Sequence, residues 1–171
     1  MQKIIETEDL IFIKPSLDLV EDYLIMANDK EVQKYISKSP KTYTYESECE
    51  WVKNKLNNNN IIFSVIEKST NNFVGNVEFF DDYELGICIT PKYQGKHYGT
   101  KILKAIISYG FEKLGLNEIT LSVYSHNEKA INCYKKLGFK EYKRDKNVNI
   151  IDGKQIDDIY MKLEKDNNNN N

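Results

Sequence analysis

The sequence predicts an α+β fold: a mixed, mostly antiparallel sheet with flanking helices and one βαβ crossover. Short apolar segments rich in strand-forming residues recur along the chain, and turns rich in Asn and Asp separate them. Helical periodicity occurs between some of these segments, most clearly at 99–114 and 127–137. Only Glu84 to Tyr124 reads strand, helix, strand, so this segment alone implies a right-handed parallel crossover. The chain is therefore not a doubly wound nucleotide fold.

The composition indicates a globular chain without a nucleic-acid or membrane signal. We expect a single domain over 1–166 and a disordered asparagine tail over 167–171. The 24 Lys+Arg and 26 Asp+Glu leave a net charge of -2, which argues against nucleic acid. No segment is apolar for long enough to cross a membrane, and no secretory signal is recognisable. Cys49, Cys88 and Cys133 form no CxxC, so neither a disulfide framework nor a metal site is indicated, and we expect a cytoplasmic protein.

The N-terminal half is expected to start with a strand at Leu10–Lys14, which Pro15 ends. Ser16 or Asp18 can cap the helix that follows. A later helix begins near Tyr45, where its acidic first turn suits the positive end of the helix dipole. The remaining elements of this half are two helical segments within 31–56 around Pro40, and strands at 61–67, 73–80 and 84–90.

The C-terminal half is expected to contain two helices and three strands. The helix at 99–114 has apolar residues at helical spacing, and Gly115 is a candidate C-cap. A strand at 118–124, a helix at 127–137 and strands at 139–143 and 156–163 follow.

The stretch from Glu84 to Thr100, ELGICITPKYQGKHYGT, carries the first functional signal. An apolar strand leads into a basic turn and then directly into a helix, whose first backbone N–H groups are suited to phosphate. The turn is not a P-loop, because Lys96 is followed by His97. It is also not a dinucleotide fingerprint, because Gly95 and Gly99 stand four apart in mid-chain. Alone, this stretch is equally compatible with an ordinary helix entry.

A second motif, NEKAINCYKKLGF at 127–139, follows the next strand. Asn127 can cap the helix, and Tyr134 lies near its end. Together the two motifs resemble the GNAT superfamily of acetyl-CoA-dependent N-acetyltransferases. The motifs cover about 73–143, and the element order extends the resemblance to the whole chain. Within the superfamily, the chain is most similar to spermidine acetyltransferases and ribosomal-protein N-terminal acetyltransferases.

The resemblance implies which residues bind acetyl-CoA. The family's phosphate signature is Q/R-xx-G-x-G/A, and Gln94 and Gly99 match its ends. His97 stands where the first glycine is usual, and glycine accepts backbone angles that histidine adopts less readily. The backbone before the turn should pair with pantetheine, and Asn127 should contact the same region. The resulting cofactor set is Ile87, Cys88, Ile89, Gln94, Gly95, Lys96, His97, Tyr98, Gly99, Thr100 and Asn127.

Tyr134 matches the family tyrosine that protonates the leaving thiolate. The competing interpretation is packing, since Ala130, Tyr134 and Leu137 share a helix face. Cys88 lies in an apolar strand and is expected to be inert. The resemblance therefore implies direct transfer in a ternary complex, without an acyl-enzyme.

A protonated amine acceptor needs a proton acceptor. Glu84 is the first choice and Glu78 the alternative, whereas Asp81 and Asp82 are expected at a solvated hairpin tip. Acidic residues could also line a mouth that attracts cations. These residues are Glu46, Glu48, Glu50, Glu78, Asp81, Asp82 and Glu84.

Three functions stay open at this point. The first is acetylation of a small-molecule amine, namely a polyamine such as spermidine. The second is acetylation of a peptide N-terminus, as in the ribosomal-protein type. The third is a non-catalytic acyl-CoA-binding module. Since spermidine acetyltransferases can be multimeric, the resemblance also leaves a homo-oligomer open.

Overall fold

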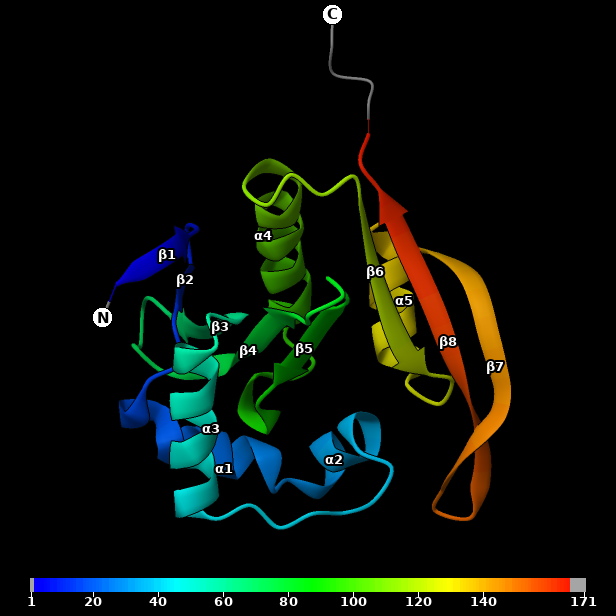
Figure 1. Ribbon diagram of the computed structural model, residues 1–171, viewed down its shortest axis with the longest axis horizontal. Helices are drawn as coiled ribbons and strands as arrows, with labels where there is room; N and C mark the ends of the chain where they lie inside the picture. Colours follow the sequence, from blue (N-terminus) through cyan, green and yellow to red (C-terminus); the bar gives the residue numbers. More distant parts are fainter. Residues whose placement is uncertain (1, 167–171) are drawn as a thin grey trace, which may run out of the picture.

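The structure is a computed structural model that describes residues 2–166, so the predicted asparagine tail lies outside the described residues. The described chain forms two antiparallel sheets with helices around them (Figure 1). The first sheet has the order β1 (Lys3–Glu6), β2 (Leu10–Ile13), β3 (Ile61–Glu67), β4 (Phe73–Phe79), β5 (Leu85–Ile89). The second has the order β6 (Glu118–Tyr124), β8 (Lys154–Glu164), β7 (Lys140–Ile151).

The helices begin at the residues that cap them. Ser16 caps a short 3-10 helix by accepting a hydrogen bond from the Asp18 N–H, and Thr44 forms a capping box with Ser47. None of the helices in the described residues is both long and apolar enough to cross a membrane. The α-helices are α1 (Val20–Ala27), α2 (Lys30–Ile36), α3 (Tyr45–Asn57), α4 (Tyr98–Glu112) and α5 (Glu128–Lys136).

The predicted crossover is β5–α4–β6, but its two strands separate almost at once. One isolated parallel bridge, between Glu84 and Thr120, joins them. Beyond that bridge, β5 keeps β4 on one side and has an open edge on the other (Figure 1). The single mixed sheet expected from the sequence is therefore divided into two.

The C-terminal hairpin is longer than expected, and β1 was not predicted at all. Asp152 and Gly153 both have positive φ, of 51° and 74°, and form a two-residue turn of the kind that suits a hairpin. From this turn β7 and β8 pair back to Lys140. Strand β7 is half charged and mostly exposed, without apolar alternation. Its strand conformation therefore depends on pairing with β8 more than on its own sequence.

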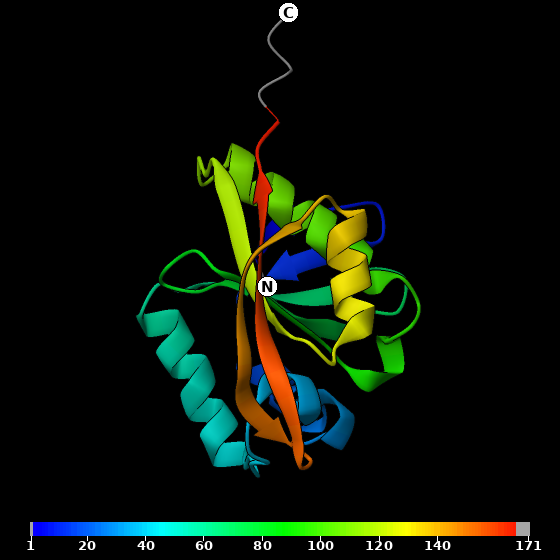
Figure 2. The same cartoon turned by 90° about the vertical axis from the view of Figure 1, so that its right-hand side faces the viewer.

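Alternation along the central strands gives the first sheet two apolar faces. On one face α4 packs through Ile102, Leu103 and Ile106, all buried as predicted from helical spacing. On the other face α1 and α3 enclose Tyr23 and Val52. The turned view places α3 and α5 on opposite sides of the first sheet (Figure 2). The strand edge of β5 lies between these two helices.

The pairing of β4 with β5 depends on the absence of a side chain at Gly75. A Cβ there would lie 2.2 Å from the Cys88 carbonyl oxygen and 3.0 Å from the Ile89 Cα. Because both are backbone atoms, we expect Gly75→Ala to lower the free energy of unfolding by roughly 1–3 kcal/mol, measured by urea denaturation. The control is Gly86→Ala, whose Cβ would meet only the ring of the exposed Phe80. Equal losses in the two variants would contradict this account.

Candidate active site

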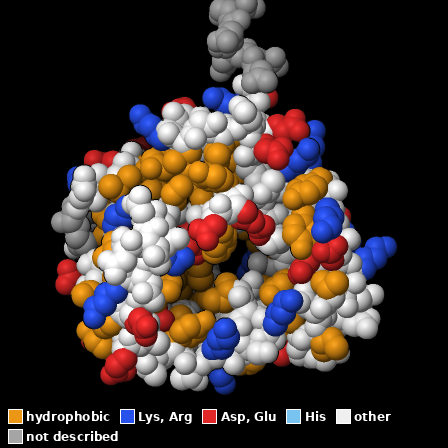
Figure 3. Space-filling view, in the orientation of Figure 1, with side chains coloured by type: hydrophobic (Ala, Val, Ile, Leu, Met, Phe, Trp, Pro, Cys, Tyr) orange, Lys and Arg blue, Asp and Glu red, His pale blue; other side chains and the backbone are white. Residues whose placement is uncertain are grey.

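A cavity of about 550 Å³ lies where β5 separates from β6. Helices α1, α2, α3 and α5 and strands β3, β4, β5, β6 and β8 all contribute to its walls. Four carboxylates and one lysine line it among the described residues, namely Glu48, Glu78, Glu84, Asp158 and Lys38. The space-filling view shows a hollow in the middle of this face, with acidic side chains at its rim (Figure 3). The cavity can therefore attract a cation.

The open edge of β5 offers main-chain groups to a ligand. In an antiparallel ladder, alternate residues direct both backbone groups to the same side. The Thr90 N–H donates to Val74 in β4 (2.9 Å), so Cys88 also faces β4, whereas Ile87 and Ile89 face the open edge. Of the three residues predicted to pair with pantetheine, Cys88 therefore has its main chain engaged in the sheet. Ile87 and the Ile89 N–H are placed for that role.

The predicted phosphate turn leads directly into α4. Gly95 has φ 71° and His97 has φ 66°, and His97 occupies the N-cap of α4 without a side-chain cap hydrogen bond. The histidine thus adopts the left-handed conformation for which the family uses glycine. Helix geometry leaves the first N–H groups of α4, at Tyr98, Gly99 and Thr100, without intrahelical partners. The turn can therefore bind an anion through its backbone.

Side chains around this turn have structural partners. The Gln94 side-chain amide donates to the Ile89 carbonyl (2.9 Å) and so ties the turn to the end of β5. The Tyr98 hydroxyl donates to Glu67, which raises the pKa of Tyr98 to about 12, and its ring lies edge-on to Tyr93. Lys96, by contrast, is exposed. Within the described chain, the main chain of this turn is therefore left free of side-chain partners that could compete for a bound anion.

Asn127 caps α5 at the other wall of the cavity. Its side-chain oxygen accepts from the Ala130 N–H (3.4 Å). The turn before it is held at Ser125, whose hydroxyl accepts from the Asp157 N–H and whose own N–H donates to the Asp157 carbonyl, both at 3.0 Å. Asn127 lines the cavity, and its contact with pantetheine stays a prediction.

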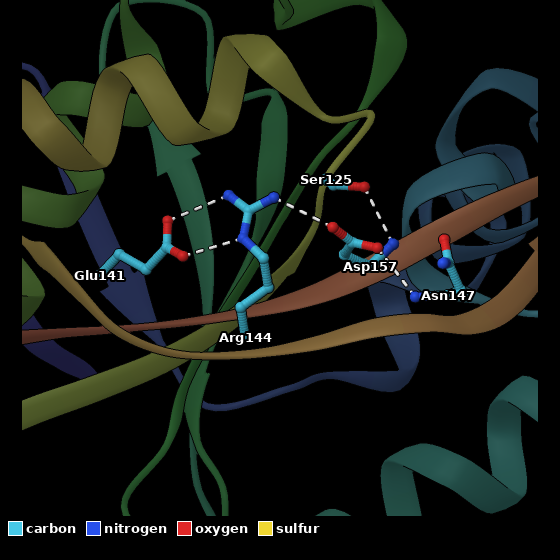
Figure 4. A network of polar contacts seen from close by, with 5 residues as sticks. All are labelled: Ser125, Glu141, Arg144, Asn147 and Asp157. Carbon is cyan, nitrogen blue, oxygen red and sulfur yellow. Dashed lines mark hydrogen bonds and ion pairs between the residues drawn. The ribbon is translucent and has the colours of Figure 1, made fainter.

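A charged network supports this turn from behind (Figure 4). Arg144 donates to both carboxylate oxygens of Glu141, at 2.9 and 3.1 Å, and to Asp157 at 3.0 Å. The Asn147 N–H also donates to Asp157 (2.8 Å). Asp157 is thus held by β7, through Arg144 and Asn147, and it positions through Ser125 the turn that carries Asn127.

Tyr134 is buried yet lines the cavity. Its ring packs edge-on against Phe139, with centroids 5.8 Å apart. Burial raises the pKa of Tyr134 above its ordinary value, so its hydroxyl stays protonated at neutral pH. Packing and proton donation are therefore compatible at this position.

The predicted acids fall into two groups. Glu84 and Glu78 line the cavity, but both are engaged: Glu84 accepts from the Ser122 hydroxyl (2.5 Å), and Glu78 pairs with Lys55 (2.7 Å). Asp81 and Asp82 are exposed at the hairpin tip, as predicted. Burial raises the pKa of the Cys88 thiol to about 12, which argues against an acyl-carrying thiolate.

The sequence reasoning missed two cavity residues as individual site candidates. Glu48 was named only as one of seven acids that could line a cation-attracting mouth, although its spacing of four from Val52 puts it on the buried face of α3. That spacing is a signal that could have identified it. Asp158 gave no such signal, because nothing in the sequence says that β8 passes the cavity.

Comparison with known proteins agrees with this geometry. A family model described as "Acetyltransferase (GNAT) domain" matches residues 9–140. The chain therefore belongs to the GNAT acetyltransferase family. Because these enzymes take their acetyl group from acetyl-CoA, the predicted class, donor and fold are confirmed.

Named relatives include spermidine acetyltransferases. The Spermidine N(1)-acetyltransferase of Escherichia coli K12 is 48% identical over 56 residues, which is 33% of this chain and 30% of that protein. The Vibrio cholerae enzyme of the same name is 31% identical over 67% of this chain and 69% of its own. A GNAT-family acetyltransferase from Bacillus anthracis superposes with a TM-score of 0.82 at 25% identity, over 94% and 97% of the two chains.

A Vibrio cholerae spermidine N-acetyltransferase, solved in complex with CoA and spermine, has the same fold. Its TM-score is 0.83 at 22% identity, over 92% of this chain and 96% of that chain. Acetyl-CoA also fits the site of the present chain. A Cβ built on Gly95 meets nothing within 4 Å, so the turn is open to a phosphate, and the open edge of β5 leads from it to the cavity. When bound there, acetyl-CoA supplies an acetyl group activated as a thioester.

The left-handed turn at His97 yields a test of backbone binding. We expect His97→Gly to bind CoA within about threefold of the parent, because the main chain supplies the donors. We expect His97→Val, which is β-branched, to lower the free energy of unfolding by roughly 1–2 kcal/mol. Calorimetric titration with CoA and thermal unfolding measure the two effects. A tenfold or greater loss of CoA affinity in His97→Gly would show that the imidazole itself binds.

Proposed function

We propose that the chain acetylates a primary amine of a polyamine such as spermidine, using acetyl-CoA and direct transfer in a ternary complex. The observation that carries this proposal is the cavity lined by Glu48, Glu78, Glu84 and Asp158 beside Tyr134. Four carboxylates against one lysine favour an acceptor with several positive charges. An anionic or neutral acceptor would leave Glu48, Glu84 and Asp158 without a counter-charge, since among the described residues only Glu78 has an ion-pair partner, Lys55.

In this proposal Glu84 takes the first amine proton, Tyr134 protonates the thiolate, and the second amine proton, released as the amide forms, replaces the one that Tyr134 gives up. Glu84, half-buried at the cavity wall, accepts the proton that the acceptor ammonium must lose before its nitrogen can attack. The Tyr134 hydroxyl, which is protonated at neutral pH, donates a proton to the leaving thiolate. Asn127 and the open edge of β5 hold the donor in place, so positioning supplies part of the rate.

The relatives support the polyamine acceptor without deciding it. Two of them are named Spermidine N(1)-acetyltransferase, and a structure with the same fold contains CoA and spermine. Acetylation of a peptide N-terminus is the second candidate, because an acidic cavity also suits a basic N-terminal segment.

We also propose a cytoplasmic location, which the free cysteines at Cys49, Cys88 and Cys133 support.

Thiol release from acetyl-CoA, followed with a panel of acceptors, tests the function. We expect turnover with spermidine and spermine, and little with aminoglycosides or short basic peptides. Turnover with peptides alone would favour the second candidate. Binding of CoA without turnover on any acceptor would refute catalysis.

The proton-donor role of Tyr134 has its own test. We expect Tyr134→Phe to lower kcat with spermidine by about 10²–10⁴-fold, while CoA binding is retained, because only the hydroxyl is removed. Tyr109→Phe is the matched control, since Tyr109 lies on α4, packs edge-on against Phe63 and does not line the cavity. An unchanged kcat in Tyr134→Phe would assign that tyrosine to packing.

A further inference from the structure

Glu48 is the one buried carboxylate among the described residues. It lies in the first turns of α3 and is only 6% exposed, one turn from the fully buried Val52. The neighbouring acids Glu46 and Glu50 are exposed on the same helix. Burial raises the pKa of Glu48, since desolvation disfavours its charged form. The fold therefore keeps an ionisable group where an apolar one would be more stable.

Within residues 2–166 the Glu48 carboxylate has no hydrogen bond or ion pair, although it lines the cavity. The other three carboxylates of the cavity are each engaged. Glu78 pairs with Lys55, Glu84 accepts from Ser122, and Asp158 accepts from the Asn149 side-chain amide (2.7 Å). Tyr23 cannot serve Glu48 as a donor, because its hydroxyl lies 2.7 Å from the Ser64 hydroxyl and accepts from the Ser16 N–H. Since Glu48 lines the cavity and has no partner among the described residues, its carboxylate is available to a cationic ligand that enters there.

The surroundings of Glu48 define the chemistry of that ligand. Trp51, three residues further along α3, and Tyr43 line the same cavity. The Trp51 ring is held edge-on to Tyr23, with centroids 5.2 Å apart, and Tyr23 is in turn edge-on to Phe73. A carboxylate beside fixed aromatic rings suits an alkylammonium group, which gains both an ion pair and a cation–π contact.

The position of Glu48 separates this subsite from the reacting end. Glu48 is carried by α3 and Tyr134 by α5, and the two helices lie on opposite sides of the first sheet (Figures 1 and 2). Both side chains nevertheless reach the same cavity. A ligand that contacts both must therefore extend across it.

We propose that Glu48, with Trp51, binds the second, non-reacting ammonium group of the acceptor, while the amine to be acetylated lies beside Tyr134. This inference rests on the proposed function and specifies how polyamines are chosen. A monoamine can present its nitrogen to Tyr134 but leaves Glu48 without a partner. Glu48 is then a specificity-determining residue that favours polyamines over monoamines.

The test compares two acceptors in one variant. Glu48→Gln keeps the shape and removes the charge. We expect kcat/KM for spermidine to fall by about tenfold or more, mainly through KM, because a charge-assisted contact is lost. For n-butylamine we expect a change of less than about twofold. Glu46→Gln is the matched control: it makes the same substitution in the same helix at an exposed position outside the cavity, and it should leave both acceptors unchanged.

The binding of spermidine can also be measured directly, without any turnover. Trp51 is the single tryptophan of the chain, so its fluorescence reports on this end of the cavity. Titration with spermidine in the absence of acetyl-CoA should change the Trp51 emission in the parent, and Glu48→Gln should weaken the apparent affinity about tenfold or more. Thermal unfolding of Glu48→Gln should match or exceed that of the parent, since the variant removes an unpaired buried charge.

Two failures can be told apart. If the parent acetylates no polyamine, the proposed function is overturned. If the parent acetylates spermidine and Glu48→Gln changes neither its KM nor the fluorescence titration, this inference alone is overturned. Equal losses for spermidine and n-butylamine would also overturn it, because they would place Glu48 at the reacting amine.

Discussion

The separation of β5 from β6 is the constraint on which the site depends. The two strands run parallel but are bridged only at Glu84 and Thr120. If β5 and β6 stayed paired, the backbone groups of Ile87 and Ile89 would form hydrogen bonds with β6, and the cavity would close. Because they diverge, one strand edge, one helix N-terminus and one acidic cavity become neighbours. The donor-binding and acceptor-binding surfaces thus arise from a single topological feature.

The electrostatics of the cavity follow from how its acids are supported. Lys55 and Asn149 engage Glu78 and Asp158, so these two carboxylates are stable without a ligand. Glu48 lacks such support, and burial raises the pKa of its carboxyl group. A site that leaves one buried carboxylate unpartnered is organised to receive a cation. The aromatic ring of Trp51 in the cavity wall favours an alkylammonium group as that cation.

Elements with strong local signals were predicted well. Apolar spacing predicted the α4 helix and its buried face, and Asn127 was correctly expected to cap α5. The long β7–β8 hairpin was predicted only in part, because β7 is charged and obtains its strand conformation by pairing with β8. The left-handed angle at His97 could be suspected from the family's glycine. It became definite only once the turn was seen to lead into α4 at that residue.

The sequence by itself predicted the order of the elements from β2 onward, the turn before α4 as a candidate anion site, and Tyr134 and Glu84 as candidates, because these depend on local spacing and short motifs. The tertiary structure alone decided which acids share one cavity. Glu48, Glu84 and Asp158 come from α3, the start of β5 and β8, and no local pattern relates them. Burial and pairing are properties of the packed chain. Only folding could therefore distinguish a solvated acid from the unpartnered carboxylate at Glu48.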